Sequence, residues 1–256
     1  MPSKVVVVTG ASSGIGASLS EVLGKQGHRV VLVARRAAEL DAVRPRCGAE
    51  AITAVADVTR RGDVEQALAT AIAKFGHVDV WVNNAGRAIS RNVSELTDDD
   101  VDTMVQVNLK SVLYGMQAVL PHFKARGAGH IVNVSSMLGR IPFATIRSMY
   151  SATKAAMNAL SASLRMELRD AFPGIAVSVV HPGVVATDFG LNALHGGPDN
   201  RHLPGAQPVE EVAAVIADVI ENPRADVYTR PGAREMVAGY YGAPDMAEAE
   251  KNFGRR

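Results

Sequence analysis

The chain has 256 residues, of which 47% are hydrophobic, so it can build one large α/β core without a second domain. The formal net charge is +1, which excludes a strongly basic nucleic-acid binder and a protein held to anionic membranes by charge. Cys47 is the only cysteine, which excludes an internal disulfide, and we expect a structural thiol in a reducing compartment.

The first predicted elements are a strand, a glycine-rich turn and a helix. Residues 5–8 are four consecutive valines, the pattern of a strand buried on both faces of a sheet. The turn contains Gly10, Gly14 and Gly16, and residues 17–23 continue as the apolar side of a helix. A helix start binds a pyrophosphate when glycines leave the approach clear, so this order predicts a dinucleotide-binding turn. A tight strand-to-helix turn without a ligand is the alternative.

The rest of the chain alternates strands with helices, which is the pattern of a parallel sheet covered on both faces. Further strands are predicted at residues 28–34, 51–55, 79–82, 130–134, 175–180 and 226–229. Helices are predicted at residues 36–45, 63–75, 150–170 and 208–220, and a long helix begins at Thr97 with a Thr-x-x-Asp capping box. We expect an α/β fold with one doubly wound Rossmann-type domain, residues 1–256, and about seven mostly parallel strands.

Residues 188–207 interrupt this alternation with four glycines and two prolines. Irregular loops of this length are uncommon in compact domains and often cover active sites, so we predict a substrate lid here. His195 and His202 lie in the segment, and we expect surface histidines because nothing in the sequence pairs with them. The polar tail, residues 243–256, is expected to be loosely held.

Tyr150 and Lys154 are four residues apart on a predicted helix and therefore share one face. A phenol titrates near ~10, and a neighbouring ammonium lowers that pKa toward the neutral range. Pairs at this spacing are also common on solvated helices. The position directly after the fifth strand, where open α/β folds bind ligands, favours a proton-exchanging tyrosine. Ser135 and Ser136 end that strand, and a hydroxyl there can donate to a substrate carbonyl.

Six motifs occur in the order and spacing of one enzyme family. They are TGASSGIG at residues 9–16, NNAG at residues 83–86, Asn108, Ser136, Tyr150-x-x-x-Lys154 and Pro182-Gly183-x-x-x-Thr187. From Lys4 to about Tyr228 the chain resembles the short-chain dehydrogenase/reductase family. Tyr150 follows Ser136 by fourteen positions, one more than the thirteen common in the family, so we expect an insertion in residues 137–149.

The resemblance implies a catalytic tetrad of Asn108, Ser136, Tyr150 and Lys154. Tyr150 would be the acid in reduction and the base in oxidation, while Ser136 orients the carbonyl or hydroxyl. Lys154 would hold the nicotinamide ribose and lower the tyrosine pKa, and Asn108 would anchor a water in a proton relay. Ser135 is the less favoured serine because its side chain should point to the opposite side of the strand.

The resemblance also implies which residues hold the cofactor. In chain order they are Gly10, Ser12, Ser13, Gly14, Ile15 and Gly16 at the pyrophosphate turn, Arg35 and Arg36 after the second strand, Asp57 and Val58 at the adenine, Asn84, Ala85 and Gly86 beside the ribose, Tyr150 and Lys154 of the tetrad, and Pro182, Gly183, Val185 and Thr187 beside the nicotinamide amide.

The end of the second strand predicts which cofactor is used. Enzymes that use NAD usually place an acid there to hold the ribose 2′-hydroxyl, and this chain has Ala34 at the apparent acid position. Arg35 and Arg36 follow directly, and the planar fork of an arginine suits a 2′-phosphate. We therefore predict NADP(H).

The expected protein is an NADP(H)-dependent oxidoreductase that transfers hydride between the nicotinamide and a carbonyl or secondary alcohol, without a metal. A dehydrogenase working in the oxidative direction, an isomerising family member and an NAD(P)-binding sensor without turnover are the alternatives. The substrate is a small molecule, in a pocket lined from residues 137–149 through Leu138, Ile141, Phe143 and Ile146.

No nucleic-acid or membrane partner is expected, because no apolar run approaches the ~18 residues of a membrane span. The first residues carry no apolar signal core, so we expect a cytoplasmic protein. The resemblance implies a homodimer or homotetramer that pairs the helices beginning near Thr97 and Tyr150.

Overall fold

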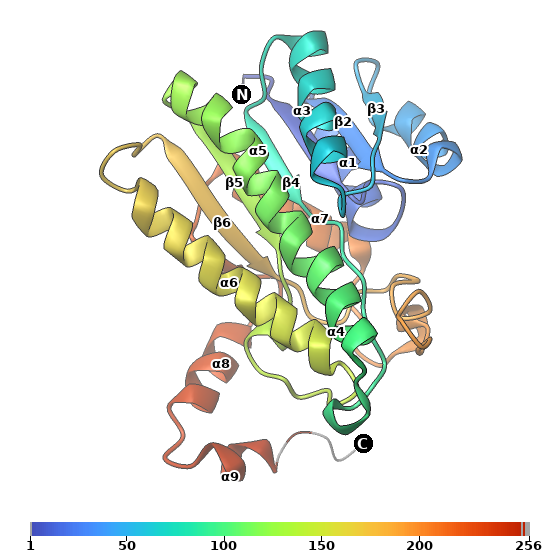
Figure 1. The fold of residues 1–256 in the computed structure, drawn as a ribbon, viewed down its shortest axis with the longest axis vertical. Helices are drawn as coiled ribbons and strands as arrows, with labels where there is room; N and C mark the ends of the chain where they lie inside the picture. Colours follow the sequence, from blue (N-terminus) through green and yellow to red (C-terminus); the bar gives the residue numbers. More distant parts are fainter. Residues whose placement is uncertain (1, 252, 254–256) are drawn as a thin grey trace.

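A parallel sheet forms the centre of the molecule in the computed structural model, which describes residues 2–251 and 253 (Figure 1). Its seven strands lie in the order β3-β2-β1-β4-β5-β6-β7, and every neighbouring pair is parallel. The strands are β1 (Val5–Thr9), β2 (Arg29–Ala34), β3 (Ile52–Val55), β4 (Val80–Asn83), β5 (Gly129–Val134), β6 (Ile175–His181) and β7 (Asp226–Tyr228). The predicted doubly wound α/β fold is confirmed.

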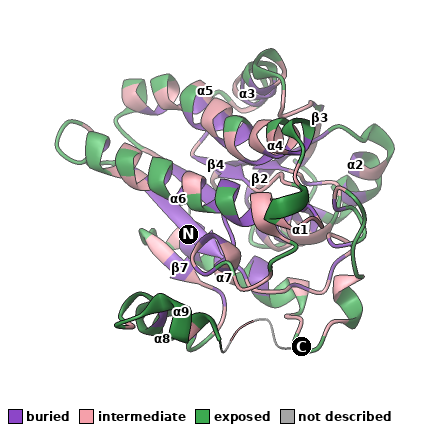
Figure 2. Cartoon of the chain, turned by 60° about the horizontal axis from the view of Figure 1, so that its bottom comes forward, coloured by how far each residue is buried: buried purple, intermediate pink, exposed green. Residues whose placement is uncertain are grey.

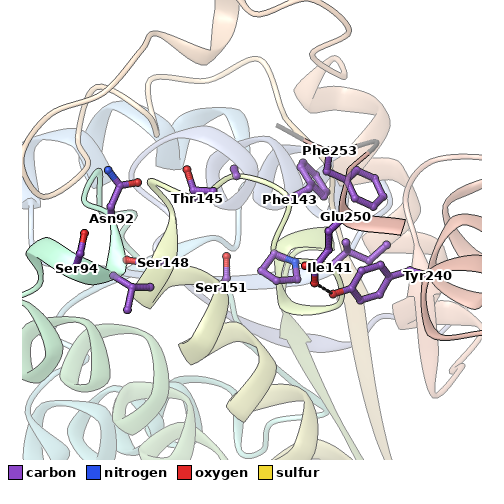
Figure 3. A pocket seen from close by; sticks show the side chains of 13 residues that line it. Asn92, Ser94, Ile141, Phe143, Thr145, Ser148, Ser151, Tyr240, Glu250 and Phe253 are labelled. Carbon is purple, nitrogen blue, oxygen red and sulfur yellow. Dashed lines mark hydrogen bonds between the residues drawn. The ribbon is translucent and has the colours of Figure 1, made fainter. Parts of the chain in front are cut away.

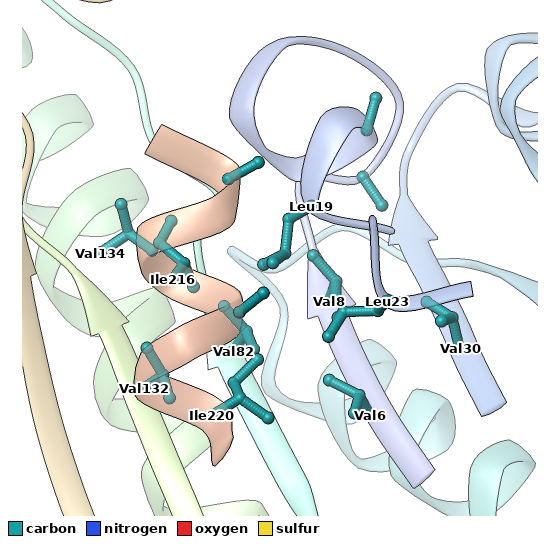
Figure 4. Close-up of a cluster of buried hydrophobic side chains, with 14 of the residues drawn as sticks. Val6, Val8, Leu19, Leu23, Val30, Val82, Val132, Val134, Ile216 and Ile220 are labelled. Carbon is teal, nitrogen blue, oxygen red and sulfur yellow. The ribbon is translucent and has the colours of Figure 1, made fainter. Parts of the chain in front are cut away.

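Helices cover both faces of the sheet. They are α1 (Gly14–Lys25), α2 (Ala37–Val43), α3 (Arg61–Phe75), α4 (Asp98–Val105), α5 (Ser111–Arg126), α6 (Ser148–Leu168), α7 (Val209–Glu221), α8 (Ala233–Tyr241) and α9 (Met246–Glu250). One apolar core joins α1, α2 and α7 to the sheet, and Figure 4 shows its central part. The second core lies under α3, α5 and α6.

The strand β1 contributes to both cores, as its unbroken run of valines predicts. Val6 and Val8 pack in the first core, and Val5 and Val7 pack in the second. All four side chains are at most 1% exposed. This places β1 in the middle of the sheet, next to β4, where the strand order reverses direction. In doubly wound sheets this reversal opens a ligand crevice beyond the carboxyl ends of the strands.

The long helix predicted from Thr97 consists of three consecutive pieces. Thr97 caps α4 as predicted, because its hydroxyl accepts the Asp100 N–H while the Asp100 carboxylate accepts the Thr97 N–H, both at 3.2 Å. A π-helical turn, η3 (Gln106–Lys110), then joins α4 to α5. Such turns hold one more residue than an α-helical turn and are frequent at functional sites.

The chain after β7 forms α8 and α9, which are mostly exposed (Figure 2). The sequence pattern did not predict a helix in residues 243–256. The Tyr240 hydroxyl donates to the Glu250 carboxylate at 2.8 Å, and the ring of Phe253 stacks on that of Phe143 at 6.0 Å. Among the described residues, no helix is long and apolar enough to cross a membrane.

Candidate active site

A cleft with a volume of about 500 Å³ runs along the carboxyl edge of the sheet. Most of the predicted site residues line it, namely Gly10, Ser12, Ser13, Gly14, Ile15, Arg35, Arg36, Asp57, Val58, Asn84, Ala85, Gly86, Ser136, Tyr150, Lys154, Pro182, Gly183, Val185 and Thr187. Gly16 and Asn108 do not line it. Arg87 lines it and was not predicted from the sequence, whereas Phe189 and Asn192 come from the predicted lid, residues 188–207. The signal for Arg87 is its position, because it directly follows the NNAG motif.

The start of α1 at this cleft is built to receive an anion. Gly10 and Gly14 have positive φ angles of 68° and 54°, which favour glycine. Within the described residues, no side chain caps α1, and its first turn contains no acidic residue. The helix α4 is the contrast, since Thr97 and Asp100 satisfy its first N–H groups. The free N–H groups and the helix dipole of α1 therefore fit a pyrophosphate.

Gly16 shapes this turn from behind rather than from within the cleft. A Cβ atom at Gly16 would lie 2.3 Å from the Gly10 carbonyl oxygen and 2.6 Å from Asn84 Nδ2. The Asn84 amide itself donates to the Thr9 carbonyl at 2.9 Å, and the Thr9 hydroxyl accepts the N–H groups of Asn84 and Ala85. These contacts hold the glycine turn against the NNAG segment, and only glycine fits between them.

The two arginines after β2 lie differently from each other. Arg36 donates to the hydroxyls of Ser12 and Ser13 at 2.9 Å and 3.3 Å, which joins it to the glycine turn. Arg35 is exposed in the cleft wall, and its charge is among the influences that lower the pKa of Asp57. Ala34 also lines this part of the cleft. The wall therefore presents two guanidinium groups where an acid would stand in an enzyme that holds a 2′-hydroxyl.

Asp57 is held at the end of β3 by its own turn. One carboxylate oxygen accepts the Thr59 N–H at 2.9 Å and the Thr59 hydroxyl at 2.7 Å. Burial raises the pKa of Asp57, but these two hydrogen bonds and the nearby arginines more than offset that effect, so its pKa is lowered. The side chain is therefore a fixed anion in the wall of the cleft at the end of β3.

Tyr150 and Lys154 lie together at the centre of the cleft, as predicted from their spacing. Lys154 Nζ is 5.6 Å from the centre of the Tyr150 ring and donates to the Val134 carbonyl at 2.8 Å. Both residues are buried, with 8% and 3% exposure.

The expectation that Lys154 lowers the pKa of Tyr150 is wrong for the protein by itself. Burial raises the pKa of Tyr150 to about 12, although the Ser136 hydrogen bond and the Arg147 charge oppose this. Burial also lowers the pKa of Lys154 to about 8. The physical reason is that removing both groups from water penalises phenolate and ammonium alike. Tyr150 is therefore a neutral phenol around neutral pH.

The two serines after β5 point in different directions, as the alternation of a strand predicts. The Ser135 hydroxyl faces the Lys154 carbonyl at 3.5 Å. The Ser136 hydroxyl accepts the Leu138 N–H at 3.1 Å, and it interacts with the Tyr150 phenol. The Leu138 N–H occupies one of the two lone pairs of the Ser136 oxygen, so the hydroxyl proton is available for a partner on the cleft side, where the Tyr150 phenol lies.

Asn108 lies in the π-helical turn behind the cleft and is fully buried. Its Oδ1 accepts the Arg87 N–H at 2.8 Å, and its Nδ2 donates to the Arg87 carbonyl at 2.9 Å and to Thr153 Oγ1 at 3.2 Å. The amide therefore braces the backbone that follows NNAG against α6. These three hydrogen bonds of Asn108 all go to protein groups next to the cleft.

The irregular segment 188–207 lies over the cleft and is fastened beside it. The Phe189 ring meets the Tyr150 ring edge-on at 5.7 Å. Leu194 forms a parallel bridge with Ile89, in which the Leu194 N–H donates to the Ala88 carbonyl and the Leu194 carbonyl accepts the Ser90 N–H. These two hydrogen bonds measure 2.8 Å and 2.9 Å.

His195 is exposed as predicted, but it is paired with a distant carboxylate, which was not predicted. Its Nε2 lies 2.6 Å from Oδ1 of Asp100, a buried carboxylate that also accepts from Arg91 at 3.0 Å. The hydrogen bond from His195 is the main cause that lowers the pKa of Asp100 to about 2. His202 is exposed as predicted, with 83% of its side chain accessible.

The loop between Ser136 and Tyr150 does not line the cleft in the way the sequence suggested. Ile141 and Phe143 face a separate cavity of about 760 Å³ between this loop, α8 and α9 (Figure 3). Leu138 packs beside Tyr150 and Phe189 instead, and Ile146 is 41% exposed. The difference arises because α8 and α9, which the sequence pattern did not predict, form the opposite wall of that cavity.

Known proteins resemble this chain along most of its length. Residues 4–195 match the family model described as short chain dehydrogenase. An uncharacterised oxidoreductase of Staphylococcus epidermidis is 39% identical over 193 residues, which is 73% of this chain and 83% of that protein.

Two solved structures extend the likeness to the fold and include bound cofactors. A short-chain dehydrogenase/reductase of Burkholderia phymatum in complex with NAD superposes with a TM-score of 0.86 at 25% identity, covering 99% of this chain and 96% of that one. An alcohol dehydrogenase of Thermococcus sibiricus complexed with 5-hydroxy-NADP has a TM-score of 0.77 at 28% identity, covering 88% and 95%.

Proposed function

Since the chain belongs to the short-chain dehydrogenase family, we propose that it is an NADP(H)-dependent oxidoreductase acting on a carbonyl or secondary alcohol. One observation carries the proposal. A neutral phenol, an ammonium and a serine hydroxyl, from Tyr150, Lys154 and Ser136, meet in the same cleft as the uncapped start of α1. An anion site for a dinucleotide and a proton donor for its substrate are thus side by side.

Each side chain has a defined task in this proposal. A bound nicotinamide supplies or accepts the hydride. Tyr150 gives a proton to the substrate oxygen in reduction and takes it back in oxidation, while the Ser136 hydroxyl donates to the same oxygen and orients it. Lys154 holds the nicotinamide ribose, and Asn108 supports the backbone at Arg87 and a water of the proton relay. The segment 188–207 is the substrate lid, with Phe189 closing over Tyr150.

The preference for NADP(H) rests on Ala34, Arg35 and Arg36 in the cleft wall. Replacing Arg35 by aspartate should lower kcat/KM with NADPH by about 10- to 100-fold, because a charge-assisted contact to a phosphate contributes ~1.5–3 kcal/mol. The same change should raise kcat/KM with NADH, since a carboxylate can accept from the 2′-hydroxyl. Steady-state kinetics with both cofactors and a panel of ketones measure this.

Arg44→Asp is the matched control, because Arg44 is an exposed arginine near α2 that lies outside the cleft. Arg44→Asp changes the net charge by the same amount as Arg35→Asp. It should therefore change the ratio of kcat/KM with NADPH to kcat/KM with NADH by no more than about twofold relative to the wild type. A wild-type protein that prefers NADH would refute the cofactor assignment while leaving the reaction type open.

The high pKa of Tyr150 predicts opposite behaviour for the two directions of the reaction. Oxidation needs the phenolate, whose fraction rises tenfold per pH unit below the pKa, so log kcat/KM for alcohol oxidation should rise with a slope near +1 from about pH 6 to about pH 7, below the pKa of Lys154. Reduction needs the phenol, which is fully present there, and should show no rise. Initial rates in both directions across this range check the signs, and oxidation that slows as pH rises would contradict the assignment.

A further inference from the structure

We propose that His181, Asp226 and Arg140 form a positioning unit for the active site, fixing the segment of Ser136 against the Pro182–Gly183 segment. This inference rests on the proposed function, because Ser136 is the residue whose placement it explains. None of the three residues lines the cleft, and none was predicted from the sequence. His181 is the last residue of β6, Asp226 is the first residue of β7, and Arg140 follows the short helix η4 (Met137–Gly139).

His181 is the centre of the unit and is completely buried. Its Nε2 lies 2.7 Å from Asp226 Oδ1, and its Nδ1 faces the Ser136 carbonyl oxygen at 3.4 Å. Its ring also stacks on that of Tyr228 at 4.9 Å with an interplanar angle of 25°. The imidazole therefore has a fixed orientation, and through its two nitrogens it links the end of β7 to the backbone of Ser136.

Asp226 gives this link a fixed charge. The Arg140 guanidinium donates to the same Oδ1 that receives His181. Burial raises the pKa of Asp226, but the hydrogen bond and charge of His181, together with Arg140, lower it to about 2. Arg140 is joined to Ser136 through η4, so the carboxylate holds both ends of that short helix, one directly and one through the imidazole.

The unit acts where the two loops of the active site meet. The Met137 N–H donates to the Pro182 carbonyl at 2.8 Å, and the Gly139 N–H donates to the Ser136 carbonyl at 3.0 Å. Pro182 directly follows His181 in the chain, so the imidazole and this backbone hydrogen bond connect the same two segments side by side. Loss of the imidazole removes its link between these segments and takes away one of the groups that hold the Asp226 carboxylate.

Variants at His181 separate positioning from simple stability. In His181→Asn the amide nitrogen can take the place of Nδ1 and still donate to the Ser136 carbonyl, whereas His181→Ala offers no donor. We expect kcat for carbonyl reduction with NADPH to fall about 10- to 100-fold in His181→Ala and at least threefold less in His181→Asn. Substrate KM and NADPH affinity should stay within about threefold in both, because Tyr150, Lys154 and the glycine turn are untouched.

His130→Ala is the matched control. His130 is also a buried histidine on a central strand, bonded to Ser178 at 2.8 Å, but it lies near the start of β5, at the opposite end of the strand from Ser136. It should lose thermal stability as His181→Ala does and keep kcat within about twofold. If kcat falls equally in both alanine variants, or in neither, the positioning role is refuted.

Hydrogen exchange provides a readout that does not depend on turnover. In the protein without cofactor, His181→Ala should speed the exchange of backbone amides in residues 136–140 by at least tenfold, while His130→Ala leaves them unchanged. Unchanged exchange there would overturn the positioning unit even in an active enzyme. If instead the wild type reduces no carbonyl with either cofactor, the proposed function fails, and the exchange result still decides whether the unit fixes Ser136.

Discussion

Tyr150→Phe should lower kcat for carbonyl reduction by about 10²- to 10⁴-fold, the range that a positioned general acid contributes. The change removes one hydroxyl from a buried ring whose packing against Phe189 stays in place. The phenol has no role in holding the pyrophosphate, so NADPH affinity should remain within about threefold. Steady-state kinetics for turnover and quenching of protein fluorescence for cofactor binding measure the two effects separately.

Tyr114→Phe is the control for loss of a phenol hydroxyl as such. Tyr114 lies on α5 with its ring 4.5 Å from the Arg61 guanidinium, outside the cleft, so the variant should retain full activity. Normal turnover by Tyr150→Phe would rule out this proton donor. A protein that binds NADPH and shows no turnover even as wild type would support the alternative of a cofactor sensor.

Gly16→Ala should weaken NADPH binding by about 5- to 150-fold. The new methyl group would lie 2.3 Å from the Gly10 carbonyl oxygen, which belongs to backbone and cannot rotate away. Overpacking of this kind costs ~1–3 kcal/mol, and the strain falls directly on the turn that receives the pyrophosphate. Cofactor titration by fluorescence gives the loss of affinity, and thermal unfolding of the apo protein gives the loss of stability.

Gly62→Ala is the matched control because Gly62 also lies in the first turn of a helix, α3, and is exposed. Within the described residues, no neighbouring atom lies within 4 Å of the place that a Cβ atom would take at Gly62. This variant should bind NADPH normally and should be slightly more stable, since alanine is favoured over glycine in a helix by up to ~1 kcal/mol. Equal affinity of Gly16→Ala and Gly62→Ala would show that the close approach at Gly16 does not matter for the cofactor.

The features predicted well from the sequence depend on local rules. The valines of residues 5–8 require burial on both sides, and the glycines that follow mark a backbone that must approach another group closely. The spacing of Tyr150 and Lys154 places them on one helix face, and the alternation of β5 separates Ser135 from Ser136. The alternation of strands and helices predicts a parallel sheet, and such sheets bind ligands beyond the carboxyl ends of their strands, so the position of the cleft could be predicted as well.

The features that were missed depend on contacts between distant residues. His195 is 95 residues from Asp100 along the chain, so its hydrogen bond has no signal in the spacing of the sequence. Whether the pKa of Tyr150 is raised or lowered depends on how deeply the folded protein buries the phenol. The four-residue spacing from Lys154 carries no information about that burial. The link from His181 to Ser136 likewise requires β5 and β6 to lie side by side.

Because of the π-helical turn at Gln106–Lys110, the number of residues between α4 and α5 matters to the structure as much as their identity. Each residue of an α-helix advances the chain by about 100°, so deleting one residue before Asn108 would turn everything upstream of it by that angle relative to α5. Substitutions in the turn change only one side chain, but a deletion would carry α4 and its Thr97 cap away from their present partners. Natural variants of this protein should therefore conserve the number of residues between Thr97 and α5 more strictly than their identity.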